Sequence, residues 1–97
     1  MTGNCGDVAV SAPYPNPVSV GPVKVDLQSA CAKRVSWSVY TPANRKILES
    51  AVNVSGKTTV MWNLTDAKGE RVAAGLYYLV FAPEGQKRRV CKVFVEP

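Results

Sequence analysis

Histidine is absent from the sequence. It is the commonest general base near neutral pH, the commonest ligand of transition metals and the usual partner of a serine or cysteine nucleophile. Seven aspartate and glutamate residues are scattered over the 97 residues, and their spacing supports no acid–base pair. We therefore expect a protein that is not an enzyme and that has no metal or cofactor site.

The sequence also lacks a long apolar run. The longest stretch, from Leu76 to Ala82, is far shorter than the roughly 20 residues that a membrane-spanning helix requires. A secretion signal consists of a charged segment followed by an apolar one, and no such leader follows Met1. We expect no membrane span, and we expect that any export signal of the parent protein lies outside this chain.

The composition is that of one folded domain. Hydrophobic residues make up 46% and charged residues 20% of the sequence, close to the averages for globular proteins, and a chain of this length builds a single core. Three cysteines lie too far apart for a CxxC metal or redox motif. Twelve basic residues against seven acidic ones give a net charge of +5, which favours acidic partners where the excess is clustered.

Seven short segments alternate β-branched or aromatic residues with polar ones, which is typical of half-buried strands. The segment 75–81 is apolar on both faces and is expected to be central. Three prolines between Ala12 and Val18 exclude a central strand there. We expect one domain overall, with a strand and a proline-rich leading segment over residues 1–17 and an immunoglobulin-like antiparallel β-sandwich over residues 18–97. The expected strands are 8–11, 23–27, 35–40, 46–52, 58–63, 75–81 and 89–95, with turns at 28–33, 41–44, 65–69 and 83–86.

The large aromatic residues have two interpretations. Trp37, Trp62 and Tyr77 could stack on a carbohydrate, but each shares a strand face with aliphatic residues, and a small sandwich needs large inward side chains. We therefore predict a core of Val35, Trp37, Val39, Val60, Trp62, Tyr77 and Leu79. Tyr77 is also the candidate for a tyrosine corner, in which the hydroxyl bonds to upstream backbone.

An up-and-down strand order would bring the turn 28–33, the turn 84–87 and the residues before Val8 to one end of the molecule. A basic patch of Lys33, Arg34, Lys87, Arg88 and Arg89 is expected there. It could bind an acidic glycan, with an ordinary solvated surface as the alternative; nucleic acid is not expected, because no aromatic residue is interleaved with these charges. The same end would bring Cys5 and Cys31 together as a possible disulfide, with three reduced thiols as the alternative, and Cys91 is expected to be a small buried hydrophobe.

Several motifs resemble one family in their order and spacing. They are Tyr14-Pro15-Asn16-Pro17, Val60-Met61-Trp62-Asn63, Asp66, Gly69, Val72, Gly75-Leu76-Tyr77-Tyr78 and Lys92-Val93-Phe94-Val95. The set is similar to the FlgD-type immunoglobulin-like domain, which shades into the C-terminal sorting domains of the type IX secretion pathway, over about the last 85 residues. One departure is Asn63-Leu64, where the family pattern has Asp-Gly. The resemblance implies a non-enzymatic β-sandwich at the end of long secreted or surface proteins.

Together these observations predict a non-enzymatic accessory module, extracellular or at the cell surface, that serves in sorting, anchoring or spacing of an exported bacterial protein. Its partners would be other domains of the parent chain or the secretion and cell-surface machinery. One alternative is a structural subunit that self-associates into a fibre or cap through edge strands, and another is a glycan-binding module that uses the basic patch. For strand addition, the expected edges are those nearest the prolines and the last strand.

Overall fold

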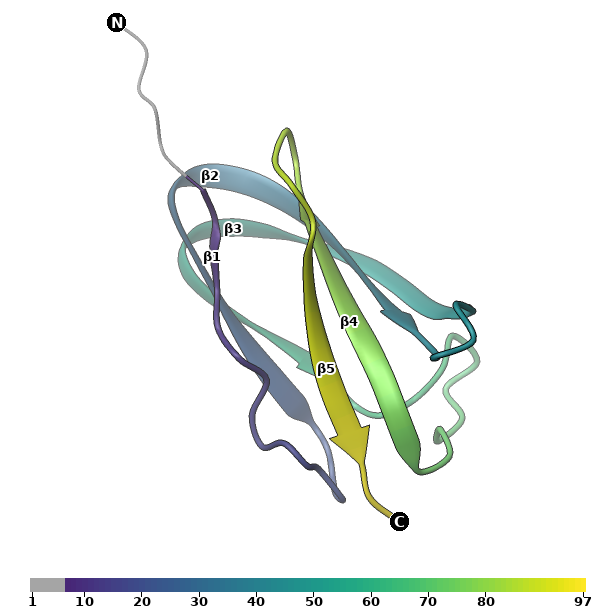
Figure 1. Cartoon of the computed structure of the whole chain (residues 1–97). Coiled ribbons are helices and arrows are strands. Elements are labelled where there is room, and N and C mark those ends of the chain that lie inside the picture. Colours follow the sequence, from purple (N-terminus) through teal and green to yellow (C-terminus); the bar gives the residue numbers. More distant parts are fainter. Residues whose placement is uncertain (1–6) are drawn as a thin grey trace, which may run out of the picture.

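The computed structural model describes residues 7–97, in which one antiparallel β-sheet accounts for all the regular structure (Figure 1). Its strands are β1 (Ala9–Val10), β2 (Val23–Tyr40), β3 (Lys46–Trp62), β4 (Gly75–Pro83) and β5 (Arg89–Val95). The order is β1-β2-β4-β5, and β3 pairs with β2. As expected, β4 lies between two neighbours. Within residues 7–97 no helix is long and apolar enough to cross a membrane.

The described residues form five strands rather than the expected seven. The expected strands 23–27 and 35–40 are two halves of β2, and 46–52 and 58–63 are two halves of β3. The predicted turn at 28–33 is therefore wrong. Small residues occupy positions 29–32, and the pairing continues through this stretch from Ser29↔Gly56 to Lys33↔Val54.

A β-bulge takes the place of that turn. Residues 30–32 of β2 oppose the single residue 55 of β3, so β2 bends without leaving the ladder. The Ser29 hydroxyl donates to the Cys31 carbonyl oxygen over 2.6 Å and stabilises the bulge. On the partner strand, Gly56 has a φ of 74°, a left-handed conformation that glycine adopts without steric cost. The interruption in alternation thus marks a bend in one strand.

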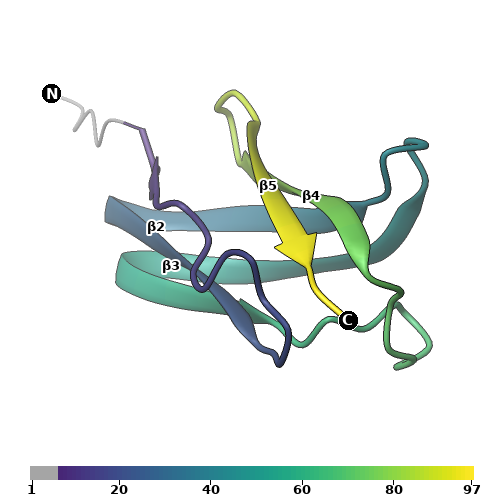
Figure 2. The same cartoon turned by 60° about the horizontal axis from the view of Figure 1, so that its bottom comes forward.

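The bend curls the sheet into a half-barrel (Figure 2). The first half of β2 pairs with β1 and its second half with β4, while β3 accompanies β2 along both halves. The segments 23–27 and 35–40 consequently do not pair with each other, as a meander would require. Both sides of the curl belong to one continuous sheet, and their inward side chains meet inside it.

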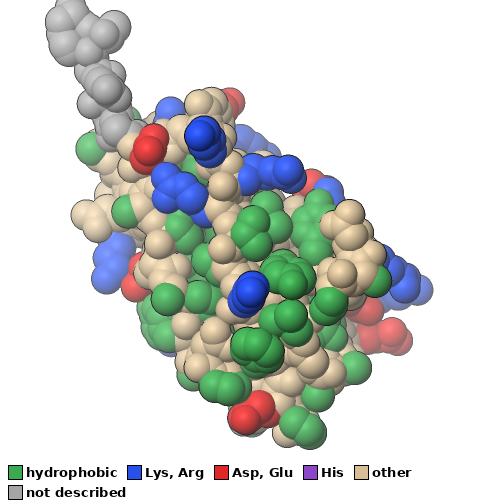
Figure 3. All heavy atoms as spheres, viewed as in Figure 1, with side chains coloured by type: hydrophobic (Ala, Val, Ile, Leu, Met, Phe, Trp, Pro, Cys, Tyr) green, Lys and Arg blue, Asp and Glu red, His purple; other side chains and the backbone are tan. Residues whose placement is uncertain are grey.

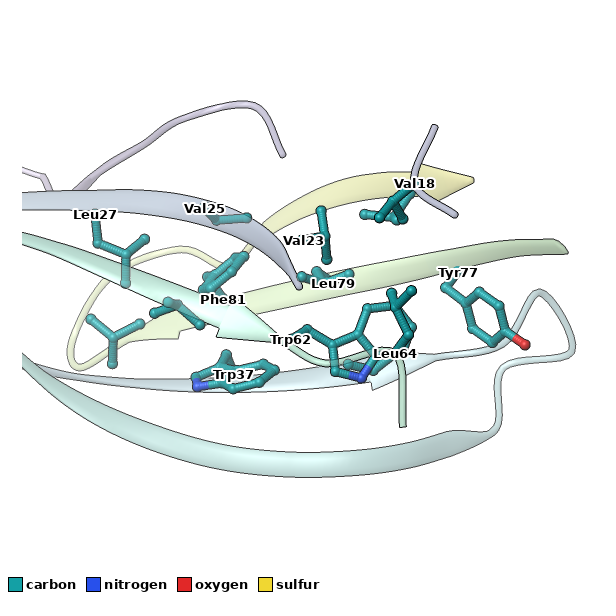
Figure 4. Packing of buried hydrophobic residues seen from close by; sticks show 14 of the residues in the cluster. Val18, Val23, Val25, Leu27, Trp37, Trp62, Leu64, Tyr77, Leu79 and Phe81 are labelled. Carbon is teal, nitrogen blue, oxygen red and sulfur yellow. The ribbon is translucent and has the colours of Figure 1, made fainter. Parts of the chain in front are cut away.

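The core fills the inside of this curl (Figure 4). The Trp62 and Tyr77 rings meet edge to face with centroids 5.5 Å apart, and the rings of Trp37 and Phe81 stack at 6.4 Å. Trp62 Nε1 donates to the Thr65 carbonyl oxygen over 2.8 Å, so this large ring is buried with its polar atom satisfied. The buried cluster includes all the predicted core positions, namely Val35, Trp37, Val39, Val60, Trp62, Tyr77 and Leu79.

Local turn chemistry agrees with the sequence. Asn44 ends the β2–β3 turn with a φ of 66°, and Gly85 lies in the β4–β5 turn with a φ of 74°. Asp66 Oδ1 accepts hydrogen bonds from the Lys68 and Glu70 amides at 2.9 and 3.0 Å. The predicted tyrosine corner is confirmed, because the Tyr77 hydroxyl donates to the upstream carbonyl of Ala73 over 2.7 Å.

Leu64 occupies the position where the family pattern has glycine. Its φ is 61°, so the backbone keeps the left-handed conformation although the residue carries a side chain. That conformation costs about 1–2 kcal/mol for a residue with a Cβ. The side chain is fully buried in the core cluster, and this burial offsets the cost.

Candidate interaction surfaces

A strap formed by residues 14–18 connects the two sides of the half-barrel. At its start, Tyr14 pairs with Lys24 of β2 through two main-chain hydrogen bonds of 2.9 and 2.8 Å. At its end, the Val18 amide donates to the Phe94 carbonyl oxygen at 2.9 Å, and the Glu96 amide donates to that of Val18 at 2.7 Å. The Val18 side chain is buried. The strap is therefore part of the fold.

Asn16 in the middle of the strap bonds to β5 through its side chain. Its Nδ2 donates to the Lys92 carbonyl oxygen, and its Oδ1 accepts from the Phe94 amide, both at 3.0 Å. The amide group thus takes the place of a paired residue, between two prolines that supply no N–H for a ladder. Together with Val18 it occupies the edge of β5 from Lys92 to Glu96. The expectation that this edge is open to strand addition is wrong over these residues.

A polar cluster fixes the first part of the strap to the outside of the sheet. The hydroxyls of Thr59 and Tyr14 both donate to Asp26 Oδ1, over 2.7 and 2.9 Å, and Lys57 Nζ lies 3.9 Å from Oδ2. The bond from Thr59, followed by that from Tyr14, lowers the pKa of Asp26. The bond to Asp26 in turn raises the pKa of Tyr14. The carboxylate serves as an anchor for hydroxyl groups.

The predicted basic residues lie near one end of the molecule but do not share one contact network. Arg34 follows the bend of β2, and its carbonyl accepts from the Glu84 amide at 3.0 Å, which places the β4–β5 turn beside it. Arg89 forms an ion pair with Asp7 at 3.7 Å, while Arg88 lines a hollow on the outside of β4 and β5. Lysine and arginine side chains gather at the top of Figure 3. The remaining residues of the predicted patch are Lys33, which is half-buried, and Lys87, which is exposed.

The cysteines are placed in part. Cys91 is a free thiol on β5, half-buried with its Sγ 4.0 Å from the Ser11 carbonyl oxygen. Burial raises the pKa of this thiol, which favours its protonated form over the nucleophilic thiolate. Cys31 lies in the bend of β2. Cys5 is outside the described residues, so the pairing of Cys5 with Cys31 stays a prediction.

The outside of β2, β4 and β5 holds a feature that sequence reasoning missed. A shallow hollow of about 690 Å³ is lined by Tyr40, Asn44, Tyr78, Val80, Arg88 and Val90. Hydrophobic side chains gather over β4 and β5 with a basic side chain among them (Figure 3). The sequence contained a signal for this apolar surface, because residues 75–81 are apolar on both faces. On β5, every second residue faces outward, namely Val90, Lys92 and Phe94.

Comparison with known proteins shows a fold and no family. No protein-family profile matches the chain, and neither does any curated protein sequence. Among solved structures, it is similar to dimeric latent PorU from Porphyromonas gingivalis, with a TM-score of 0.70, 16% identity and coverage of 99% of this chain. It is also similar to PorZ of the same organism, with a TM-score of 0.62, 25% identity and coverage of 93%.

The two neighbours are much longer proteins. The match covers 10% of the PorU chain and 11% of the PorZ chain. PorZ is described as an essential bacterial surface component of the type IX secretion system. The fold of this chain is therefore that of one small part of each of these proteins.

Proposed function

We propose that this chain is a non-enzymatic accessory module of a larger exported bacterial protein, with a sorting, anchoring or spacing role. The observation that carries the proposal is the structural match, in which nearly the whole chain superposes on about a tenth of PorU and of PorZ. A fold that recurs as a small part of long chains is the expected property of an appended module. The surface location described for PorZ supports export.

The resemblance to FlgD-type immunoglobulin-like and type IX sorting domains supports the same role. Three of the residues that carry it stabilise the fold, because Asn16 closes the edge of β5, Asp66 accepts the turn amides and Tyr77 forms the corner bond. These contacts explain why a β domain of this type would need those residue types at that spacing. We infer that the chain is a variant of this domain type in which Leu64 replaces the turn glycine.

A fusion experiment tests the proposed role. The chain is placed at the C-terminus of a periplasmic reporter enzyme in a bacterium that has a type IX secretion system, and the reporter is assayed on the cell surface and in the medium. A matched reporter carries an unrelated β domain of similar size. We expect the reporter outside the outer membrane only with this chain. Equal retention of both fusions in the periplasm would reject sorting and leave spacing within a chain as the role to test.

One observation bears on the assembly alternative. In the described part of the chain, β3 pairs only with β2, so it forms a long edge strand. Its exposed positions include Lys46, Glu49 and Lys57, and charged side chains on an edge oppose pairing with another copy. The edge therefore favours a module over a fibre subunit. A single monomeric species in sedimentation velocity at high protein concentration is the expected result.

A further inference from the structure

The outer face of the half-barrel carries apolar side chains that are only partly buried. We define it as the outward side chains Tyr40, Leu76, Tyr78, Val80, Val90, Lys92 and Phe94. A strand that is apolar on both faces is usually covered on both. Here the inward residues of β4 are buried, but its outward residues Leu76, Tyr78 and Val80 are only half-buried. On β5, Val90 is 61% exposed and Phe94 is 50% exposed.

The strand register gives this face a regular pattern. Val80 lies opposite Val90, Tyr78 opposite Lys92 and Leu76 opposite Phe94. Along β5 the outward order is thus apolar, basic, apolar, at alternate residues. Alternate residues of a strand are about 6.6 Å apart, so Lys92 lies between two apolar positions that an extended chain could reach together.

The charge of the outer face is positive. Lys92 is exposed at its centre, and Arg88 lines the hollow on one side of it. At the other end of the tyrosine row, Lys46 lies 5.8 Å from the centroid of the Tyr40 ring and is bonded to Glu49 at 3.2 Å. The Glu49 carboxylate is thus paired with Lys46. Lys92 and Arg88, which lie next to the apolar positions, can therefore attract an acidic partner.

We propose that the outer face docks an extended acidic segment of a partner protein, in which a carboxylate lies between two apolar side chains at alternate positions. The carboxylate would meet Lys92, and the apolar side chains would cover Val90 with Val80 and Phe94 with Leu76. A second copy of the chain is disfavoured as the partner, because two basic outer faces on chains with a net charge of +5 would repel each other. This inference goes beyond the proposed function and does not depend on it.

A peptide titration tests the proposal. The ¹⁵N-labelled domain is titrated at low salt with the acetylated, amidated peptide Leu-Thr-Glu-Thr-Phe and with its matched control Leu-Thr-Lys-Thr-Phe. We expect amide shift changes over Leu76 to Val80 and Val90 to Phe94 with the acidic peptide, and about tenfold weaker binding of the lysine peptide, since attraction is exchanged for repulsion. Raising the salt concentration should weaken the acidic peptide's binding.

Charge reversal at Lys92 sharpens the test. Its side chain is exposed, and only its carbonyl oxygen bonds to the strap, so Lys92→Glu should fold and unfold like the wild type. In this variant the preference should reverse, with the lysine peptide binding more tightly. Lys68→Glu makes the same change in net charge at an exposed turn position and should keep the wild-type preference.

Four outcomes would overturn the proposal. They are no shift changes with either peptide at millimolar concentration, equal binding of the two peptides, shift changes outside the outer face, and an unchanged preference in Lys92→Glu. If a sulfated oligosaccharide shifts the same amides and neither peptide does, the outer face is a glycan site instead. Concentration-dependent broadening of these amides in the absence of peptide would assign the face to self-association.

Discussion

The side chain of Asn16 should be a measurable contributor to stability although it is exposed. Asn16→Ala removes the hydrogen bonds to the Lys92 carbonyl and from the Phe94 amide. Each intramolecular hydrogen bond contributes about 0.5–1.5 kcal/mol net, and exposed bonds lie at the lower end of this range because water replaces them. We expect the free energy of unfolding to fall by about 1–2 kcal/mol.

The assay is urea denaturation followed by tryptophan fluorescence, with hydrogen exchange as a local measure. The denaturation midpoint should fall without a change in slope, since the same surface is exposed on unfolding. The Phe94 amide should exchange faster in Asn16→Ala, because its acceptor is lost. A change in unfolding free energy below about 0.3 kcal/mol together with unchanged exchange at Phe94 would refute this account of the strap.

Asn16→Asp separates the two bonds. A carboxylate can still accept from the Phe94 amide, but it cannot donate to the Lys92 carbonyl and it repels that oxygen. At neutral pH the aspartate variant should be less stable than the wild type. Protonation supplies a donor, so the deficit should shrink as the pH falls below the carboxyl pKa. A deficit that does not change with pH would contradict this assignment.

Four further predictions concern the core, the corner, the polar cluster and the disulfide. Leu64→Ala and Leu64→Gly should both destabilise the fold by about 2–5 kcal/mol through lost burial. The glycine variant should be the more stable of the two by about 1 kcal/mol, because φ at this position is positive. The reverse order of stability in urea denaturation would count against left-handed strain at this residue. Tyr77→Phe should cost about 1 kcal/mol through loss of its hydroxyl bond, and an unchanged denaturation midpoint would argue against the corner. The pKa of Asp26 is lowered in the folded state, so this carboxylate stabilises the fold at pH values above its ordinary pKa of 3.8, and the contribution is lost as the pH falls through the lower folded pKa. Asp26→Asn should therefore make the melting temperature depend less on pH in the acid range. The same acid dependence in the variant and the wild type would reject this. Reduction of the purified chain should add the mass of two hydrogen atoms if Cys5 and Cys31 are bridged, and an unchanged intact mass would rule the disulfide out.

Much of the fold follows from local signals in the sequence. Alternation identified part of every strand, and Pro42 with Asn44, Asp66 and Gly85 marked turns that the structure contains. These features act over a few residues, so a sequence pattern records them directly. The large inward aromatics were placed for the same reason.

The bend in β2 could not be predicted in this way. A β-bulge and a turn both interrupt alternation with small residues, and only the pairing of Ser29 with Gly56 and of Lys33 with Val54 distinguishes them. The number of strands depended on that distinction.

The interaction surfaces show a second limit. Periodicity tells which side chains share a face of a strand, but it does not tell whether another layer covers that face. The apolar character of both faces of 75–81 predicted a central strand, which β4 is, but it did not tell that the outward side chains stay half-buried. The bond between Asn16 and β5 joins residues that are 76 and 78 positions apart, a distance over which a local pattern carries no information.

A domain exchange in PorZ tests the claim that this chain is an accessory module of an exported protein. The segment of PorZ that superposes on this chain is replaced by this chain, and surface display of the chimera in Porphyromonas gingivalis is measured with an antibody to the rest of PorZ. If the chain is an accessory module of this type, the chimera should reach the surface, whereas PorZ with an unrelated β domain of the same size should not. Failure of the chimera to appear at the surface, with the exchanged domain folded, would contradict the claim.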